Sequence, residues 1–312
     1  QDLLEEMGLV GQHAYTILDV REVEGEGGEE VRLVKLRNPW GQKEWTGEWS
    51  DSSGSWTPEL KQALGYTSEN DGSFWMSFSD FSHYFSVVTV CKVNDNYEYT
   101  SLKCCQKDIP YSLVEIVVDE SSHHFIDISQ VDKRCFLDDS GYDYSPCRFI
   151  IAKVLPGGYL DYIGGKYQIG RNIWEEFTLE KGRYVVFVEI EYLKPNLSSG
   201  FVISSYGQTK TRLREVDRAE FPQFLGDVYK SCAKKMGTKT DFSTDGAPDC
   251  YKYSYISPDG YGFNYYENLS DDATIRENIC YTKFEGLQLL PPWSGTEYEA
   301  CVAPGEDLVV LI

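Results

Sequence analysis

The chain opens with two apolar segments separated by a polar loop. Residues 13–23 and 31–37 are rich in Val, Ile, Leu and Tyr, and residues 24–30 between them are all Gly or Glu. Apolar β-branched segments on either side of a glycine-rich loop predict a β-hairpin. The start of the first segment and the end of the second then lie at the same open end of that hairpin.

The rest of the first ninety residues carries shorter signals. Pro58 in the first turn and Gly65 at the exit predict a short helix over residues 57–64. A second short helix is expected over residues 79–84. The valine-rich residues 87–93 predict a strand that closes this part of the chain.

Residues 94–211 alternate apolar and polar positions with the period of a strand. Val186, Val188 and Ile190 fall on one side of such a strand, and Glu189 falls on the other. Short alternating segments joined by glycine-containing turns predict an antiparallel β-sandwich. The expected strands are residues 112–118, 123–131, 147–155, 183–192 and 201–206.

The last hundred residues mix a helical and a β-like pattern. A helix is predicted over residues 212–237, with Pro222 interrupting or starting its main part. From Cys250 onward the chain is tyrosine-rich and predicts a further β-rich module, in one interpretation a degenerate second sandwich. The expected fold class is therefore α+β, with three domains at residues 1–93, 94–211 and 212–312.

Charge narrows the classes of partner. The chain has 29 Lys and Arg against 50 Asp and Glu, a net charge of −21, and its pI is near 4.6. A nucleic-acid partner is excluded on this ground, because phosphate binding needs basic surface. Many carboxylates suit calcium binding or a solvated acidic surface. The sequence has no run of about 18 apolar residues that would predict a membrane-spanning helix.

The cysteines point to a reducing compartment. There are nine, an odd number, and Cys104 and Cys105 are adjacent. This pattern predicts free thiols in a cytoplasmic protein. It also argues against a structural zinc site, since no CxxC pair has a matching second pair.

Candidate chemistry lies at the open end of the predicted hairpin. His13 stands in Gly-Gln-His-Ala-Tyr and Asn38 in Arg-Asn-Pro-Trp-Gly, close enough for a hydrogen bond between their side chains. A histidine oriented by an amide is the base that a cysteine nucleophile needs. Taken singly, such a histidine is usually a packing or surface residue, and an asparagine before proline is usually a turn residue.

These motifs resemble the second half of the calpain protease core, which shares Gly-x-His-Ala and Asn-x-Trp-Gly with papain-type enzymes. Residues 44–51 (Glu-Trp-Thr-Gly-Glu-Trp-Ser-Asp) and residues 71–81 (Asp-Gly-Ser-Phe-Trp-Met-Ser-Phe-Ser-Asp-Phe) extend the resemblance over nearly all of the first 93 residues. It implies a papain-like, β-rich half of the core. It also implies a general base in His13, an orienting amide in Asn38 and a gating indole beside the cleft in Trp40.

The same resemblance implies Ca²⁺ as a cofactor. Glu44, Asp51 and Asp71 match carboxylate ligands, and Glu69 and Ser73 match positions that contribute backbone carbonyls. Carboxylate and carbonyl oxygens are the ligands that calcium prefers. The alternative is that these are ordinary surface acids near tryptophans.

The nucleophile is not among the nine cysteines. None of them lies in a Gly-x-Cys-Trp setting, and Cys91 falls in a valine-rich segment typical of core packing. The resemblance places the nucleophilic cysteine and the oxyanion-hole donors in the other half of the core, upstream of Gln1. We therefore expect the chain by itself to have no peptidase activity.

The middle of the chain resembles the C2-like sandwich that follows the calpain core, notably at residues 125–132 (Phe-Ile-Asp-Ile-Ser-Gln-Val-Asp). In calpains an acidic sandwich loop is thought to sense calcium or phospholipid, so a membrane surface is an expected partner. The acids expected to gather on the sandwich loops are Asp119, Glu120, Asp132, Asp138, Asp139 and Asp143. Residues 241–246 lack the oxygens of an EF-hand loop, so the resemblance is to a non-conventional calpain.

Two hypotheses of function follow. In the first, the chain is part of a calcium-dependent cysteine endopeptidase that performs limited proteolysis of protein substrates in the cytoplasm. In the second, it belongs to a calpain-like protein without a nucleophile, which serves as a calcium- or membrane-responsive binding module. The presence of both His13 and Asn38 favours the enzyme, because a scaffold has no chemical need for them.

Overall fold

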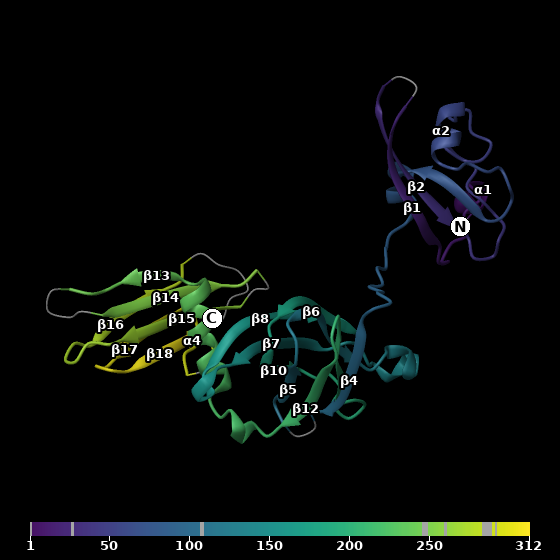
Figure 1. The fold of residues 1–312 in the computed structure, drawn as a ribbon. Coiled ribbons are helices and arrows are strands. Elements are labelled where there is room, and N and C mark those ends of the chain that lie inside the picture. The colour runs from purple at the N-terminus through teal and green to yellow at the C-terminus, as the bar shows by residue number, and fades with distance from the viewer. Residues whose placement is uncertain are drawn as a thin grey trace. The chain divides into compact units, whose positions relative to one another are not determined.

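The computed structural model describes residues 2–25, 28–106, 109–244, 249–258, 261–282, 289–290 and 292–312. It divides the chain into two compact units, an N-terminal unit of residues 1–92 and a C-terminal unit of residues 93–312 (Figure 1). Glu26 and Gly27 of the predicted hairpin loop lie outside the described residues, as do Asp245 and Gly246 of the segment compared with an EF-hand. Within the described part of the chain, no helix is long and apolar enough to cross a membrane.

The N-terminal unit is a small antiparallel sheet with three short helices. The strand order is β1-β2-β3. The predicted hairpin is confirmed, with Thr16 opposite Arg37 at its open end. The elements are α1 (Asp2–Glu6), β1 (Thr16–Glu24), β2 (Glu30–Arg37), α2 (Pro58–Ala63), β3 (Ser73–Ser77) and α3 (Phe78–Tyr84).

The central strand β2 is buried because apolar groups cover both sides of it. Val34 and Leu36 pack with Phe74 and Met76 in one cluster, while Leu33 joins a second cluster rich in tryptophan. The first cluster lies under the open end of the hairpin and supports the residues that follow β2.

The strand predicted over residues 87–93 is absent. These residues have no regular secondary structure, and Val87 and Val93 are 77% and 76% exposed. A run of valines favours the extended conformation but does not supply a partner strand, and a strand is stable only when its backbone is paired. None of the described strands pairs with this segment.

The C-terminal unit begins with two antiparallel sheets, ordered β12-β5-β10-β7-β8 and β4-β11-β6-β9. One buried cluster takes side chains from both sheets, including Ile116, Ile128, Phe149, Val186 and Ile203. The sheets therefore face each other across a shared core. The strands are β4 (Glu98–Cys105), β5 (Ser112–Val118), β6 (Ser122–Gln130), β7 (Pro146–Val154), β8 (Leu160–Ile169), β9 (Asn172–Leu179), β10 (Gly182–Ile190), β11 (Gly200–Gly207) and β12 (Thr211–Val216).

A helix and two further sheets complete this unit. Helix α4 (Phe224–Met236) packs between the five-stranded sheet and the sheet β13-β14-β15-β18, through a shared apolar cluster (Figure 1). The two-stranded ribbon β16-β17 packs against the other side of that sheet. The bounds are β13 (Thr238–Asp241), β14 (Cys250–Ile256), β15 (Gly262–Asn268), β16 (Ile275–Cys280), β17 (Glu297–Val302) and β18 (Asp307–Leu311).

The helix predicted over residues 212–237 is wrong in its first part. Residues up to Val216 belong to β12, which pairs with β5 across the predicted boundary at 211/212. Arg214 of β12 bonds the buried carboxylate of Glu115 on β5 at 2.6 Å. The helix starts at Phe224, two residues after Pro222, which cannot donate a backbone hydrogen bond in a helix interior. The chain as a whole is β-rich, of the α+β class.

Candidate active site

His13 and Asn38 meet at the open end of the hairpin. His13 lies three residues before β1, and Asn38 directly follows β2. Because Thr16 pairs with Arg37, the two side chains extend from neighbouring positions. His13 Nε2 and Asn38 Oδ1 are 2.9 Å apart, so the predicted hydrogen bond between these residues is present.

The carboxamide of Asn38 is held in one orientation. Its side chain is fully buried, and its Nδ2 donates to the carbonyl oxygens of Gln42 and Lys43 at 2.7 and 3.2 Å. A flipped amide would place an oxygen against those two carbonyls. Oδ1 must therefore face Trp40 N, which donates to it at 3.1 Å, and His13 Nε2.

The orientation of this amide selects a tautomer of His13. Since Asn38 Oδ1 only accepts, Nε2 of His13 must carry the hydrogen that forms their bond. In the neutral ring, Nδ1 is then the nitrogen with a free lone pair. Nδ1 is thus the atom that can take a proton from a reacting group.

Two aromatic rings border the imidazole. The ring centroid of Trp40 lies 4.4 Å from that of His13, and the ring of Tyr15 meets it edge-on at 5.1 Å. Trp40 is 55% exposed, so it covers the imidazole from the solvent side. Both rings limit how far the imidazole can turn about its bond to Asn38.

The three carboxylates predicted to bind calcium share one electrostatic environment. Burial, together with the negative charges of Glu44 and Asp71, raises the pKa of Asp51 to about 6. Glu44 Oε1 accepts from Gly72 N at 2.7 Å. Asp71 Oδ1 accepts from Ser73 N at 2.8 Å, and this backbone bond lowers the pKa of Asp71.

These residues offer the donor chemistry of a calcium site without forming a closed cage. The negative charges of Glu44 and Asp71 disfavour the charged form of Asp51, and such a carboxylate environment suits a divalent cation. The carbonyl of Glu69 accepts from Asp71 N at 2.8 Å, which keeps the two residues in one turn. Among the residues that the structure describes, however, no group of three or more His, Cys, Asp or Glu side chains is arranged to hold a metal ion.

Comparison with known proteins points to one protein family. Residues 2–92 match the model of a family described as calpain family cysteine protease. The match covers nearly all of the N-terminal unit and less than half of the chain. Over 90 residues the chain is 43% identical to calpain-9 of Rattus norvegicus, and over 101 residues it is 43% identical to calpain-5 of Mus musculus. Over 88 residues it is 46% identical to the calpain-2 catalytic subunit of Mus musculus.

The matches cover a small share of each protein. They span 28%, 29% and 27% of this chain, and 13%, 16% and 12% of calpain-9, calpain-5 and the calpain-2 catalytic subunit. Among solved structures, a protein from Sulfurospirillum deleyianum has a TM-score of 0.27 at 12% identity, covering 36% of this chain and 99% of its own. The Yersinia pseudotuberculosis-derived mitogen has a TM-score of 0.23 at 8% identity, over 36% and 86%.

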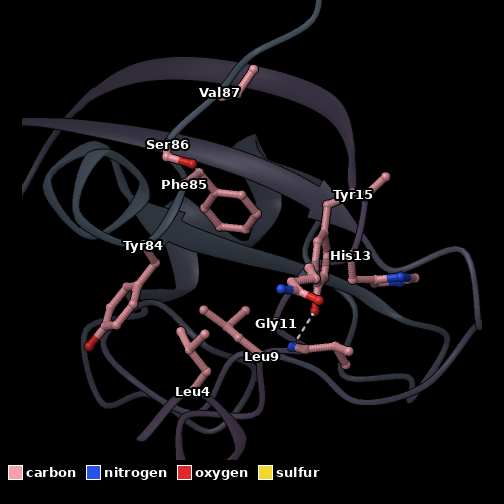
Figure 2. Close-up of a pocket in the computed structure, with 12 residues that line it drawn as sticks. Leu4, Leu9, Gly11, His13, Tyr15, Tyr84, Phe85, Ser86 and Val87 are labelled. Atoms are coloured by element: carbon pink, nitrogen blue, oxygen red, sulfur yellow. Dashed lines mark hydrogen bonds between the residues drawn. The ribbon is translucent and has the colours of Figure 1, made fainter. Parts of the chain in front are cut away.

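The N-terminal unit also has a hollow beside the histidine that the sequence did not suggest. Its volume is about 420 Å³, and Figure 2 shows Tyr15 and Phe85 at one side of it and Leu4 and Tyr84 at another. His13 lies at the edge, with its imidazole directed away from Leu4 and Tyr84. The lining residues come from both ends of the unit, so no local motif could have indicated them. They are Leu4, Leu9, Val10, Gly11, Gln12, His13, Ala14, Tyr15, Tyr84, Phe85, Ser86 and Val87.

The acidic residues of the C-terminal unit do not form a single loop. Asp119 and Glu120 precede β6, whereas Asp132, Asp138, Asp139 and Asp143 follow it, so the two groups lie at opposite ends of a nine-residue strand. Such a strand spans roughly 27 Å. Cations already pair with three of these acids: Arg212 with Asp119 at 2.6 Å, Arg134 and Arg171 with Asp132 at 2.8 and 3.2 Å, and Lys133 with Asp143 at 3.9 Å. The prediction that all six gather is wrong.

Proposed function

We propose that this chain carries the histidine and asparagine half of a calcium-dependent, calpain-type cysteine endopeptidase that performs limited intracellular proteolysis. The observation that carries the proposal is the locked pair of His13 and Asn38, in which the amide fixes the tautomer of the imidazole. The cysteine nucleophile is supplied by a segment outside this sequence. Protein substrates and a cytoplasmic location are part of the same proposal.

The residues of this chain act on protons. Nδ1 of His13 accepts the proton of the cysteine thiol, and the resulting imidazolium stabilises the thiolate. After the thiolate has attacked the peptide carbonyl, the same nitrogen donates its proton to the leaving amine. Asn38 holds the ring throughout, because its Oδ1 accepts from Nε2 in both protonation states.

Calcium would be held by the carboxylates of Glu44, Asp51 and Asp71, with backbone carbonyls of Glu69 and Ser73. When bound, it supplies positive charge that offsets the mutual repulsion of the three carboxylates. Glu44 accepts a hydrogen bond from Gly72, a neighbour of Asp71, so the loop that would respond to calcium lies beside the turn of Asn38. A C-terminal sandwich of C2-like type that meets phospholipid through Asp138, Asp139 and Asp143 completes the proposal.

The alternative, a calpain-like binding module without a nucleophile, makes no use of a fixed imidazole. Nothing in calcium or membrane binding requires that Nε2 of His13 carry the hydrogen or that Nδ1 be available. The enzyme accounts for this arrangement, and the binding module leaves it without a purpose.

The test is proteolysis by this chain joined to the segment that precedes it in its own protein. We expect cleavage of casein that depends on calcium, stops with a chelator and is lost in His13→Ala. The matched control is His83→Ala, which removes an exposed histidine of the same unit. Wild-type cleavage by His13→Ala, or a preceding segment that has no cysteine in a Gly-x-Cys-Trp setting, would overturn the proposal.

A further inference from the structure

The geometry points to Tyr15 as a positioning residue for His13: it holds both the face of the imidazole and the turn that precedes it. This inference rests on the proposed function for its catalytic meaning. Its structural content, the control of the imidazole by Tyr15, is independent of activity.

The first contact of Tyr15 fixes the backbone before the histidine. Its phenolic oxygen accepts from Val10 N at 2.9 Å, the bond drawn in Figure 2. The enclosed turn contains Gln12 at φ 53°, a left-handed conformation that costs a non-glycine residue free energy. Such a turn persists only when its surroundings hold it. The hydroxyl of Tyr15 closes the turn from the far side of His13.

The second contact is between rings. The plane of Tyr15 meets that of His13 at 80° with centroids 5.1 Å apart. Tyr15 also meets Phe85 at 88° and 5.4 Å, and Phe74 at 76° and 6.0 Å. Edge-to-face contacts between rings have a preferred geometry. The contacts with Phe74 and Phe85 therefore fix the position of the phenol ring, and the phenol ring in turn limits the orientation of the imidazole.

These contacts supply what the hydrogen bond to Asn38 lacks. One bond at Nε2 fixes the distance to Asn38 Oδ1, but it leaves the imidazole free to turn about that axis. Trp40 borders the ring from a largely exposed position. Tyr15 borders it from the protein interior and thereby sets where Nδ1 points.

A purely packing role for Tyr15 predicts something different. Tyr15 packs against the same apolar cluster as Tyr84, which lines the same hollow. The ring of Tyr84 is tilted at 59° to that of Trp45, with centroids 5.4 Å apart, and it meets the ring of His83 at 4.7 Å. If Tyr15 only filled space, Tyr15→Leu and Tyr84→Leu would have equal effects on His13.

The experiment is side-chain ¹⁵N NMR of His13 in the 312-residue chain. We expect one neutral tautomer, with hydrogen on Nε2, in the wild type and in Tyr84→Leu. In Tyr15→Leu we expect shifted and broadened His13 ¹⁵N signals, because the imidazole then turns about its bond to Asn38. Tyr15→Phe keeps the ring and loses only the hydroxyl, so it should give at least a twofold increase in the width of these signals, smaller than that of the leucine variant.

The outcomes are decisive in either direction. A folded Tyr15→Leu chain with wild-type ¹⁵N shifts overturns the inference, and so does an equal change in Tyr84→Leu. If Tyr15→Leu does not fold, Tyr15→Phe decides, and wild-type shifts in that variant overturn the inference as well.

An activity measurement separates this inference from the proposed function. In the joined protein, Tyr15→Leu should lower kcat about tenfold with little change in KM, the result expected when a reacting group is misplaced. Tyr84→Leu should keep wild-type kcat. If the wild-type joined protein has no activity, the proposed function fails, while the ¹⁵N result for Tyr15 stands by itself.

Discussion

The backbone N–H of Asn38 donates to the carbonyl oxygen of Gly72 at 2.8 Å. The N–H of the same glycine donates to Glu44 Oε1 at 2.7 Å. Gly72 is therefore hydrogen-bonded through its carbonyl to Asn38 and through its N–H to Glu44, one of the three carboxylates predicted to bind calcium. A shift of the loop that contains Asp71 must therefore move the backbone of Asn38, because Gly72 follows Asp71 in the chain and is hydrogen-bonded to Asn38.

Replacing Gly72 by alanine should damage the Asn38 turn. Gly72 has φ +85°, and a Cβ there would lie 2.6 Å from Asn38 O and 2.9 Å from Gly41 Cα. We expect about 1–2 kcal/mol of destabilisation from the backbone conformation and roughly 1–3 kcal/mol more from the clash. Urea unfolding followed by tryptophan fluorescence measures the sum.

Gly65→Ala is the matched control for this change. Gly65 has φ +56°, but nothing lies within 4 Å of a Cβ built on it. It should therefore show the conformational cost alone, with unchanged signals for His13. Equal destabilisation in the two variants would show that the close approach of Gly72 to Asn38 has no energetic weight.

Asn38→Asp should unfold more easily than the wild type even though its shape is unchanged. The substitution replaces Nδ2, which donates to the carbonyls of Gln42 and Lys43, by an oxygen that repels both. A lost bond at a fully buried group costs about 1–3 kcal/mol, and more when a charge is buried. Asn96→Asp, at an exposed position, is the control for urea unfolding. A variant as stable as the wild type would mean that these carbonyls do not hold the amide.

The hairpin and the meeting of His13 with Asn38 could be predicted because both depend on local sequence. A glycine-rich loop between β-branched segments defines the pairing, and the pairing brings the two ends together. The role of Tyr15 could not be found in this way. Its partners Val10, Phe74 and Phe85 come from separate segments, and a tyrosine beside a strand has no distinguishing spacing.

The failures in the rest of the chain have the same cause. Residues 212–216 contain residues with good helix propensity, yet β5 offers an edge and Glu115 a buried partner for Arg214, and these tertiary contacts prevail. Residues 87–93 form no strand despite their strand-like sequence, because none of the described strands pairs with them. In both segments the intrinsic secondary-structure propensity favours one conformation, and the presence or absence of tertiary contacts determines whether that conformation forms.

Acid should destabilise the C-terminal unit through His124. This residue is fully buried, with its ring nitrogens 2.8 Å from Ser122 Oγ and 3.3 Å from Ser205 Oγ. Burial lowers the pKa of His124, and the neighbouring His123 lowers it further. As the pH falls, His124 therefore binds a proton in the unfolded chain at a pH at which it is still neutral in the folded chain. Stability is complete above a pH of about 6.5 and falls by up to ~1.4 kcal/mol per pH unit below it.

His124→Gln isolates this effect. Urea unfolding followed by NMR signals of the C-terminal unit, at about pH 7.5 and about pH 5.5, on either side of the ordinary histidine pKa, should show a smaller acid loss for the variant than for the wild type. His123→Gln, at the adjacent and partly exposed position, should keep most of the wild-type loss. An identical acid loss in His124→Gln would show that the buried imidazole is not responsible.

Asp51→Asn should stabilise the calcium-free chain and abolish its response to calcium. The pKa of Asp51 is raised from 3.8 to about 6, so the folded chain binds more protons than the unfolded chain between these values and loses stability as pH rises through them. Asparagine has no carboxyl group to ionise, so the variant avoids this loss of stability. It should therefore have the higher Tm at neutral pH with a chelator present. Calcium at 100 times its Kd should stabilise the wild type by about 2.7 kcal/mol and the variant little. Glu59→Gln, an exposed acid of α2, should behave as the wild type. A full calcium shift in Asp51→Asn would remove this residue from the ligand set, and no shift in the wild type would remove the set.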